Sequence, residues 1–361
     1  MESLLNSFPS GASPSASLSV PAAETGEKER ERSPEAMRSL AAEVPLARPL
    51  YLRLSVTERC NLHCLYCRPG KGDDSGGEEN PALSDGEILS LLAQVKASLP
   101  VHKIRLTGGD PLVRPGLPRL VGKIRMLLPH AELALTTNGL LLSKQAVALK
   151  ENGLDSMNVS LDTLDEERFE AVSGVGGLSN VIGGIRAARA AGFEKIKLNT
   201  VLLRSVNGDR LPDLARFAND AGCELRMIEL MPIGVASGQF GKEFFPAEEA
   251  LSSLRSEFGE PVPLGSGGTS TRYLFPAGGR NILIGVIPTI SAPFCDGCDR
   301  LRIDSRGWLY PCLHDYQGVD LMELSRRESP EKVREWIRRV HDEKKRPVLD
   351  WTSRTMIRIG G

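Results

Sequence analysis

Short apolar runs alternate with longer segments of helical periodicity from residue 50 to about residue 230, and this alternation constrains the fold most strongly. Strands are expected at Leu50–Val56, Lys103–Thr107, Glu132–Thr136, Ser156–Leu161, Ile196–Leu202 and Leu225–Leu230. Helices are expected at Asp85–Ser98, Ser143–Asn152, Val181–Ala191 and Leu211–Ala221. Consecutive βα units predict parallel strands with right-handed crossovers, hence an α/β sheet or partial barrel.

Glycines support this segmentation. Gly153, Gly192 and Gly222 each follow an expected helix, at the position where a left-handed residue ends a helix. The first strand is not followed by a GxGxxG fingerprint, and the sequence contains no Walker A loop. A barrel-like arrangement is therefore favoured over a nucleotide-binding Rossmann domain.

The flanking regions differ in composition. Residues 1–45 are rich in Ser, Ala and Pro and carry the mixed charge run Glu27–Arg32, so a flexible tail is expected. Residues 46–240 are expected to form the partial barrel, and residues 241–361 a smaller elaboration packed on it. Within that elaboration, Gly265–Ser270 is expected to be a surface loop, and a charged helix is expected from about Pro330 to Glu343.

Charge and hydropathy narrow the class of protein. The 45 Lys and Arg residues nearly balance 46 Asp and Glu, which argues against a general nucleic-acid binder. No apolar run approaches the roughly 18 residues of a membrane span. The first basic residue is Lys28, and no apolar leader follows a charged start, so the expected location is the cytoplasm.

Cysteine usage indicates metal binding. Six of the seven cysteines form two groups of three, Cys60, Cys64 and Cys67 followed by Cys295, Cys298 and Cys312. An odd count in a long chain makes a poor disulfide framework, whereas grouped thiols in a reducing compartment more often hold metal. The lone Cys223 is expected to be a buried structural thiol.

The first group has Cys-x3-Cys-x2-Cys spacing and directly follows the first strand. Barrel enzymes carry their chemistry at this end of the strands. Three thiolates can hold three irons of a [4Fe–4S] cluster and leave the fourth iron open, which is typical of a catalytic metal site. A structural zinc site completed by His63 fits poorly, because zinc groups are usually built from separated Cys-x2-Cys pairs.

The second group has Cys-x2-Cys-x13-Cys spacing. Leu301 and Ile303 alternate with charged residues, and the turn Ser305–Gly307 predicts a hairpin that returns Cys312 toward the other two cysteines. The residues alone leave two readings open, an iron–sulfur cluster or a zinc site completed by His314.

Polar residues recur in successive strands and at their carboxyl ends, which favours a lined pocket. Arg53, Arg105 and Lys197 are basic residues that can converge on an anion. Further polar residues in the same units are Thr136, Ser160, Asp162 and Asn199. The pair Gly108–Gly109 after the second strand would permit close backbone approach to a ligand.

The first cysteine group, with Tyr66 before its last cysteine, resembles the radical S-adenosylmethionine (SAM) enzymes. The resemblance implies that SAM chelates the open iron and that one electron cleaves SAM to methionine and a 5′-deoxyadenosyl radical, which abstracts a substrate hydrogen. Gly108–Asp110 looks like the Gly-Gly-Glu segment of that family, which contacts the SAM amino group, but has Asp110 where Glu is usual.

The second group and Arg300–Arg302 resemble the GTP 3′,8-cyclases of molybdenum cofactor biosynthesis, and the likeness extends from about Arg53 to the last residue. It implies a second [4Fe–4S] cluster whose open iron meets the guanine base. The implied SAM ligands are Tyr66, Gly109, Ser160 and Met231. The implied GTP ligands are Arg53, Arg105, Thr136, Lys197, Arg300, Leu301 and Arg302. Catalytic roles are implied for Arg300, Arg302 and a Gly360–Gly361 tail that reaches the active site.

The reaction implied by this resemblance begins with hydrogen abstraction from the ribose 3′ carbon of GTP. Attack on guanine carbon 8 then gives a cyclised dihydro-GTP on the route to pyranopterin. An electron donor and a downstream pyranopterin-forming enzyme are implied partners, and a homodimer is allowed. Departures from the family are Arg68 after Cys67, where Met is common, and the polar linker Gly70–Pro81. The alternatives are a peptide-modifying radical SAM enzyme, an iron–sulfur electron carrier and a zinc-binding module.

Overall fold

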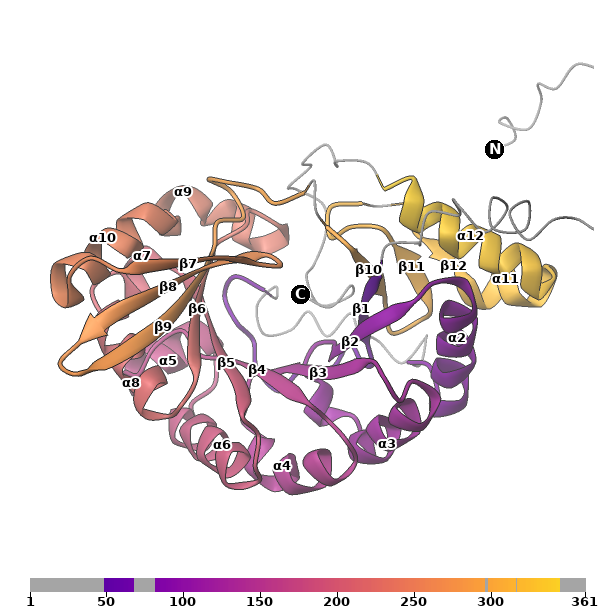
Figure 1. Ribbon diagram of the computed structural model, residues 1–361, viewed down its shortest axis with the longest axis horizontal. Helices are drawn as coiled ribbons and strands as arrows, with labels where there is room; N and C mark the ends of the chain where they lie inside the picture. The colour runs from indigo at the N-terminus through magenta and orange to yellow at the C-terminus, as the bar shows by residue number, and fades with distance from the viewer. Residues whose placement is uncertain (1–48, 68–81, 296–297, 316, 345–361) are drawn as a thin grey trace, which may run out of the picture. The chain divides into compact units, whose positions relative to one another are not determined.

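The computed structural model describes residues 49–67, 82–295, 298–315 and 317–344. The expected flexible tail, Arg68, the Gly70–Pro81 linker and the terminal Gly360–Gly361 lie outside these residues. In the part described, one sheet has the strand order β12-β11-β10-β1-β2-β3-β4-β5-β6-β9-β8-β7 (Figure 1). No helix of this part is long and apolar enough to cross a bilayer.

The centre of the sheet consists of parallel strands followed by helices. The strands are β1 (Leu50–Ser55), β2 (Val101–Thr107), β3 (Glu132–Thr137), β4 (Ser156–Ser160), β5 (Lys195–Leu202) and β6 (Glu224–Glu229). The helices among them are α2 (Asp85–Ser98), η1 (Pro111–Val113), α3 (Leu117–Leu127), α4 (Leu142–Glu151), α5 (Glu166–Ser173), α6 (Leu178–Ala190), α7 (Arg204–Asn207) and α8 (Leu211–Asp220). Figure 1 shows these strands in an arc with α2, α3, α4, α6 and α8 along its outer side. The expected α/β partial barrel is confirmed.

Alternation along each strand separates an apolar outer face from a polar inner face. In β1, Leu50, Leu52 and Leu54 are buried in the core, while Tyr51 and Arg53 occupy the other face. The outer leucines pack with the apolar sides of the helices, as in α2, where Ile88, Leu91, Leu92 and Val95 are buried. The expected glycine helix ends are also confirmed, because Gly153, Gly192 and Gly222 have φ of +87°, +85° and +66°.

Residues beyond 240 extend this sheet at both edges. On one side β9 (Arg280–Ile287) pairs parallel with β6, and β8 (Ser270–Ala277) and β7 (Val262–Gly267) follow antiparallel. On the other side β10 (Arg300–Ile303) pairs parallel with β1, and β11 (Trp308–Tyr310) and β12 (Val319–Asp320) follow. The remaining helices are η2 (Gly234–Gly238), α9 (Phe240–Glu243), α10 (Ala247–Phe258), α11 (Leu321–Arg327) and α12 (Pro330–Asp342).

The expectation of a surface loop at Gly265–Ser270 is wrong. Gly265 lies within β7, Ser270 begins β8, and the two strands pair antiparallel. The turn passes through Gly268, whose φ of +68° suits a tight hairpin and which glycine adopts without steric cost. A composition typical of loops therefore marks a two-residue connection between strands.

Glu229, the last residue of β6, joins the carboxyl-terminal loops to the barrel. Its side chain is 1% exposed and accepts hydrogen bonds from the backbone N–H groups of Ala247, Ile290 and Ser291, each at 2.9 Å. The Ser291 hydroxyl donates a further bond at 2.7 Å. One carboxylate thus satisfies donors from two segments that are distant in sequence.

We expect Glu229→Ala to lower the free energy of unfolding by about 3 kcal/mol or more, because it strands several buried donors. Urea unfolding of the metal-free protein measures this loss. Glu249→Ala is the matched control, since Glu249 pairs with Arg204 at a side-chain exposure of 51%, and such surface pairs contribute less than about 1 kcal/mol. Equal losses in the two variants would contradict the structural role of Glu229.

Candidate functional site

The first cysteine group lies in the loop after β1, at the carboxyl end of the parallel strands. The Cys67 N–H donates to the Cys64 carbonyl at 2.9 Å, which turns the loop back on itself. Burial, followed by the charges of Cys67, Asp162 and Cys60, raises the pKa of the Cys64 thiol well above its usual range. Cys60 and Cys67 are therefore close enough to Cys64 to oppose the ionisation of its thiol. A bound metal centre supplies the positive charge that such thiolates require.

Backbone hydrogen bonds on one side and an ion pair on the other fix this loop against the barrel. The N–H groups of His63 and Leu65 donate to the carbonyls of Ser173 and Val172 at 2.8 and 2.9 Å. On the other side, Glu58 binds Arg306 of the β10–β11 turn through two nitrogen–oxygen contacts of 3.1 and 3.3 Å. The loop that carries the first cysteines is thereby joined to the hairpin that carries part of the second group.

Gly108 and Gly109 are required by the packing of this loop. A Cβ on Gly109 would lie 2.3 Å from the Arg59 carbonyl oxygen, and one on Gly108 would lie 2.3 Å from that of Thr57. The N–H groups of Gly109 and Asp110 donate to the same two carbonyls, Thr57 and Arg59, at 2.9 and 2.8 Å. Only glycine permits this approach of two backbone segments. The implied contact of Gly109 with SAM stays a prediction.

The Asp110 carboxylate is directed at the protein itself. It is 1% exposed and accepts from the Thr137 hydroxyl at 2.8 Å, the Asn138 N–H at 2.6 Å and the Leu112 N–H at 2.9 Å. Burial nonetheless raises its pKa to about 6. The Asn138 side chain in turn donates to Cys60 Sγ at 3.7 Å. Asp110 therefore ties the ends of β2 and β3 together beside the first cysteine group.

The other residues implied in SAM binding lie at the same end of the sheet. The Tyr66 hydroxyl donates to Asp162 just after β4, at 2.6 Å, and Ser160 ends that strand. Burial raises the pKa of Asp162 to about 6. Met231 follows β6 and packs against an apolar cluster that contains Leu313, the residue after Cys312. The Tyr66 contact therefore brings the end of β4 to the first cysteine loop, whereas Met231 packs beside the residue that follows Cys312.

Three arginines, Arg302, Arg53 and Arg105, form a row across the inner face, which we call the basic row. The parallel register makes Arg302 of β10 and Arg53 of β1 direct neighbours, and Arg53 likewise neighbours Arg105 of β2. One layer nearer the amino end, Tyr51 stands between Arg300 and Lys103 in the same register. Arg105 and Arg302 are 4% and 7% exposed. Five basic side chains thus gather on three adjacent strands.

Electrostatics within this basic row favour an anionic ligand. Burial lowers the pKa of Arg53 to about 10 against the opposing effect of Tyr51, and repulsion from Arg105 and Arg300 adds to the decrease. Burial and the charges of Arg53 and Arg300 lower the pKa of Arg302 well below its usual range. Although burial acts in the opposite direction, nearby Arg105, Arg53 and Lys103 lower the pKa of Tyr51 to about 8. Clustered cations in a low-dielectric wall attract polyanions such as a triphosphate.

Thr136 and Lys197 continue the inner face beyond the basic row. Thr136 accepts from Arg105 Nη1 at 3.3 Å, and the register runs from Thr136 through Asn158 to Lys197. Lys197 lies 3.5 Å from Glu224, and burial, with the Arg226 charge, lowers its pKa. Leu301 is different, because its side chain is 0% exposed in the core. Any contact of Leu301 with a ligand on the inner face must use its backbone.

The second cysteine group lies at the opposite, amino end of the strands. Cys298 precedes β10, and Cys312 follows the antiparallel β11, so both belong to the same end. The Cys298 N–H donates to the Cys295 carbonyl at 3.2 Å. The hairpin pairs Arg302 with Tyr310, and continuing this register places Cys312 opposite Arg300. The expected hairpin and the return of Cys312 are confirmed.

The ligand arrangement bears on the choice between zinc and a cluster. Within the described ranges, no three His, Cys, Asp or Glu side chains converge as ligands of a single metal ion. Zinc requires its ligands around one ion, whereas the thiolates of a four-iron cluster each bind a different iron. All six grouped cysteines are free thiols. Three grouped thiolates that leave one iron open match the ligand set of a four-iron cluster.

Sequence relatives decide the family. A Pelotomaculum thermopropionicum protein named GTP 3′,8-cyclase is 41% identical over 280 residues, which cover 75% of this chain and 83% of the relative. One of the same name from Heliobacterium modesticaldum is 40% identical over 285 residues, 77% of this chain and 84% of the relative. The chain belongs to the GTP 3′,8-cyclase family.

Family models agree with this membership, and a solved structure shares the fold. Residues 54–218 match the Radical SAM superfamily, and residues 223–348 match Molybdenum Cofactor Synthesis C. The crystal structure of Streptococcus suis SuiB bound to precursor peptide SuiA superposes with a TM-score of 0.57 at 16% identity. That superposition covers 83% of this chain and 72% of SuiB. At this identity the likeness concerns the fold alone.

For this member of the GTP 3′,8-cyclase family, sequence reasoning missed Tyr51, Lys103 and Lys344 beside the candidate site, and it missed the contact of the strand-end residue Asn138 with Cys60. Tyr51 and Lys103 precede Arg53 and Arg105 by two positions, so strand alternation alone places them on the same face. Asn138 and Lys344 contact Cys60 and Cys298 across long sequence separations. No local pattern marks those two contacts.

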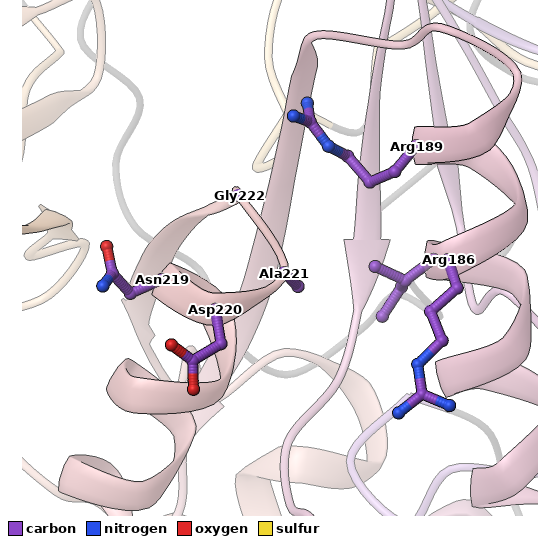
Figure 2. Close-up of a pocket in the computed structure, with 7 residues that line it drawn as sticks. Arg186, Arg189, Asn219, Asp220, Ala221 and Gly222 are labelled. Carbon is purple, nitrogen blue, oxygen red and sulfur yellow. The ribbon is translucent and has the colours of Figure 1, made fainter.

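A groove of about 360 Å³ lies elsewhere, between the carboxyl ends of α6 and α8 (Figure 2). Arg186 and Arg189 line one side and Asn219–Gly222 the other. Arg189 is engaged by the carbonyls of Phe193 and Glu194, at 2.8 and 3.2 Å. The groove is formed by the outer helices of the barrel. It is therefore separate from the inner face, where the GTP ligands implied by the resemblance to the GTP 3′,8-cyclases lie.

Proposed function

We infer that this protein is a radical SAM lyase that converts GTP to (8S)-3′,8-cyclo-7,8-dihydroguanosine 5′-triphosphate in molybdenum cofactor biosynthesis. One observation carries the inference beyond family membership. The basic row of Arg53, Arg105 and Arg302 lies between cysteine groups at opposite ends of β1 and β10. A triphosphate nucleotide bound there has one cluster site on each side of it.

The proposed ligands of the first [4Fe–4S] cluster are Cys60, Cys64 and Cys67, and those of the second are Cys295, Cys298 and Cys312. When bound, the first cluster and SAM supply the one-electron chemistry that removes the ribose 3′ hydrogen. We place SAM beside Tyr66, Gly109, Ser160 and Met231. The support is that these residues share the carboxyl end of the sheet with the first cysteine group.

GTP is proposed to bind Arg53, Arg105, Thr136, Lys197, Arg300, Arg302 and the backbone of Leu301. The chain's own contribution is orientation, since the 3′ carbon and carbon 8 of one substrate must be held in near-attack geometry. Arg105 is held for this purpose by Tyr51, at 2.5 Å, and by the Leu135 carbonyl, at 2.9 Å. Arg300 and Arg302, with the terminal Gly360–Gly361, are the proposed catalytic residues.

Partners and location extend the proposal. An external reductant is required because SAM cleavage consumes an electron, and a pyranopterin-forming enzyme would consume the product. A cytoplasmic location is supported by the grouping of six cysteines, which favours metal binding in a reducing compartment over a disulfide framework. A homodimer is proposed from the family resemblance, and size-exclusion chromatography measures it. The near balance of 45 basic and 46 acidic residues favours neither nucleic acid nor a membrane surface as a partner.

Anaerobic turnover tests the reaction. Protein reconstituted with iron and sulfide and reduced with dithionite is given SAM with GTP, or SAM with ATP as the control, and products are analysed by mass spectrometry. We expect 5′-deoxyadenosine and a cyclised GTP product, both only with GTP. SAM cleavage without change in GTP would favour a peptide-modifying radical SAM enzyme. No cleavage by cluster-loaded protein would exclude the proposed reaction.

A further inference from the structure

Lys344, which lies two residues beyond the end of α12, contacts the second cysteine group. Lys344 Nζ donates to Cys298 Sγ at 3.0 Å and to the Arg300 carbonyl at 2.6 Å. Arg300 Nε also donates to Cys298 Sγ, at 3.3 Å. One thiol of the second group thus receives hydrogen bonds from two cationic side chains.

The helix that presents Lys344 is anchored to the body of the protein. Val333, Ile337 and His341 of α12 are buried, and Arg338 donates to the Ser98 carbonyl at the end of α2, at 3.3 Å. The Lys344 ammonium is therefore delivered by a packed element rather than by an unsupported loop. Its second bond, to the Arg300 carbonyl, fixes it at the start of β10.

The first cysteine group has donors of another kind. Cys60 Sγ accepts from the neutral Asn138 amide at 3.7 Å and from the Leu62 N–H at 3.5 Å. Charge-assisted hydrogen bonds are shorter and stronger than neutral ones. Hydrogen bonds to the sulfurs and nearby charge set the reduction potential of an iron–sulfur cluster. Among the contacts of the described residues, Cys298 accepts from two cations, whereas Cys60 accepts from an amide and a backbone N–H.

We propose that Lys344 is a positioning residue of the second cluster that raises its reduction potential by placing a positive charge on the Cys298 sulfur. The proposal rests on the proposed function, because it requires a cluster at this site. Reduction adds one electron from a chemical reductant to the cluster and changes no bond of the protein. The charge of Lys344 stabilises the more negative, reduced form.

Potentiometric titration followed by EPR tests this in the full chain. Changing Cys60, Cys64 and Cys67 together to alanine leaves the second cluster as the source of signal. In this background we expect Lys344→Met to shift the midpoint to lower potential, and Lys344→Arg to restore most of it. The midpoint of Lys332→Met should match that of the parent, because Lys332 lies on α12, the helix before Lys344, with a side-chain exposure of 63%.

The outcomes separate the inference from the function on which it rests. An unchanged midpoint in Lys344→Met, with iron content equal to that of the parent, would overturn the role of Lys344 alone. Lys344→Gln provides a second neutral variant and must shift the midpoint in the same direction as methionine. Absence of iron from the parent itself would overturn the proposed second cluster. A loss confined to stability, with no shift in potential, would make Lys344 a structural residue only.

Discussion

Cys64→Ala is expected to abolish formation of 5′-deoxyadenosine, with a loss of about 10³-fold or more, the scale on which enzymes lower reaction barriers. Two remaining thiolates cannot hold a cluster that already leaves one iron to the cosubstrate. The iron content should fall by about half, because the second cysteine group is untouched. Liquid chromatography of SAM products and colorimetric iron analysis measure the two effects.

Cys223→Ala is the matched control for this substitution. Cys223 is 7% exposed in the barrel core, and burial raises the pKa of its thiol to about 11. Cys223 belongs to the hydrophobic core and to neither cysteine group, so it is not among the proposed cluster ligands. We expect full iron content and nearly unchanged turnover. Similar losses in Cys64→Ala and Cys223→Ala would mean that the first group is not the cluster site.

Arg53→Met is expected to weaken GTP binding by roughly 10- to 100-fold, the equivalent of one or two charge-assisted hydrogen bonds. Arg53 is the middle member of the basic row, between Arg302 and Arg105. Its removal relieves repulsion between buried guanidinium groups, so the protein without GTP should be at least as stable as the wild type. Weaker binding together with retained stability is typical of a residue kept for function.

Calorimetric titration with GTP and thermal unfolding measure the two sides of this prediction. Arg186→Met is the control, since Arg186 is an exposed residue of α6 in the outer groove (Figure 2). It should change neither quantity. A large loss of stability in Arg53→Met, with proportionate loss of binding, would make the basic row a structural element instead of a nucleotide site.

Local patterns predicted the barrel well. Period-2 alternation located β1, and glycines located the ends of helices such as α4 and α6. The same alternation, read one step further back from Arg53 and Arg105, would have added Tyr51 and Lys103. The spacing of the first cysteine group and its position after β1 were both visible without coordinates. These features depend on residues within a few positions of one another.

Long-range pairing was beyond the reach of such patterns. Nothing in the alternating segment Arg300–Ile303 shows that β10 lies beside β1, since register across a sheet depends on partners distant in sequence. The contacts of Lys344 with Cys298 and of Glu58 with Arg306 are of the same kind. The prediction of a surface loop at Gly265–Ser270 was wrong for a different reason. Hairpin turns and surface loops share the same amino-acid composition.

The pairing of β1 with β10 sets an order of events during synthesis. β1 leaves the ribosome early, yet its partner on that side, β10, comes only at Arg300–Ile303. Until then the nascent chain presents an open strand edge, which invites aggregation. That edge closes only after Arg300–Ile303 has been synthesised, late in the 361-residue chain. The basic row, which includes Arg302 of β10, is likewise complete only at that stage.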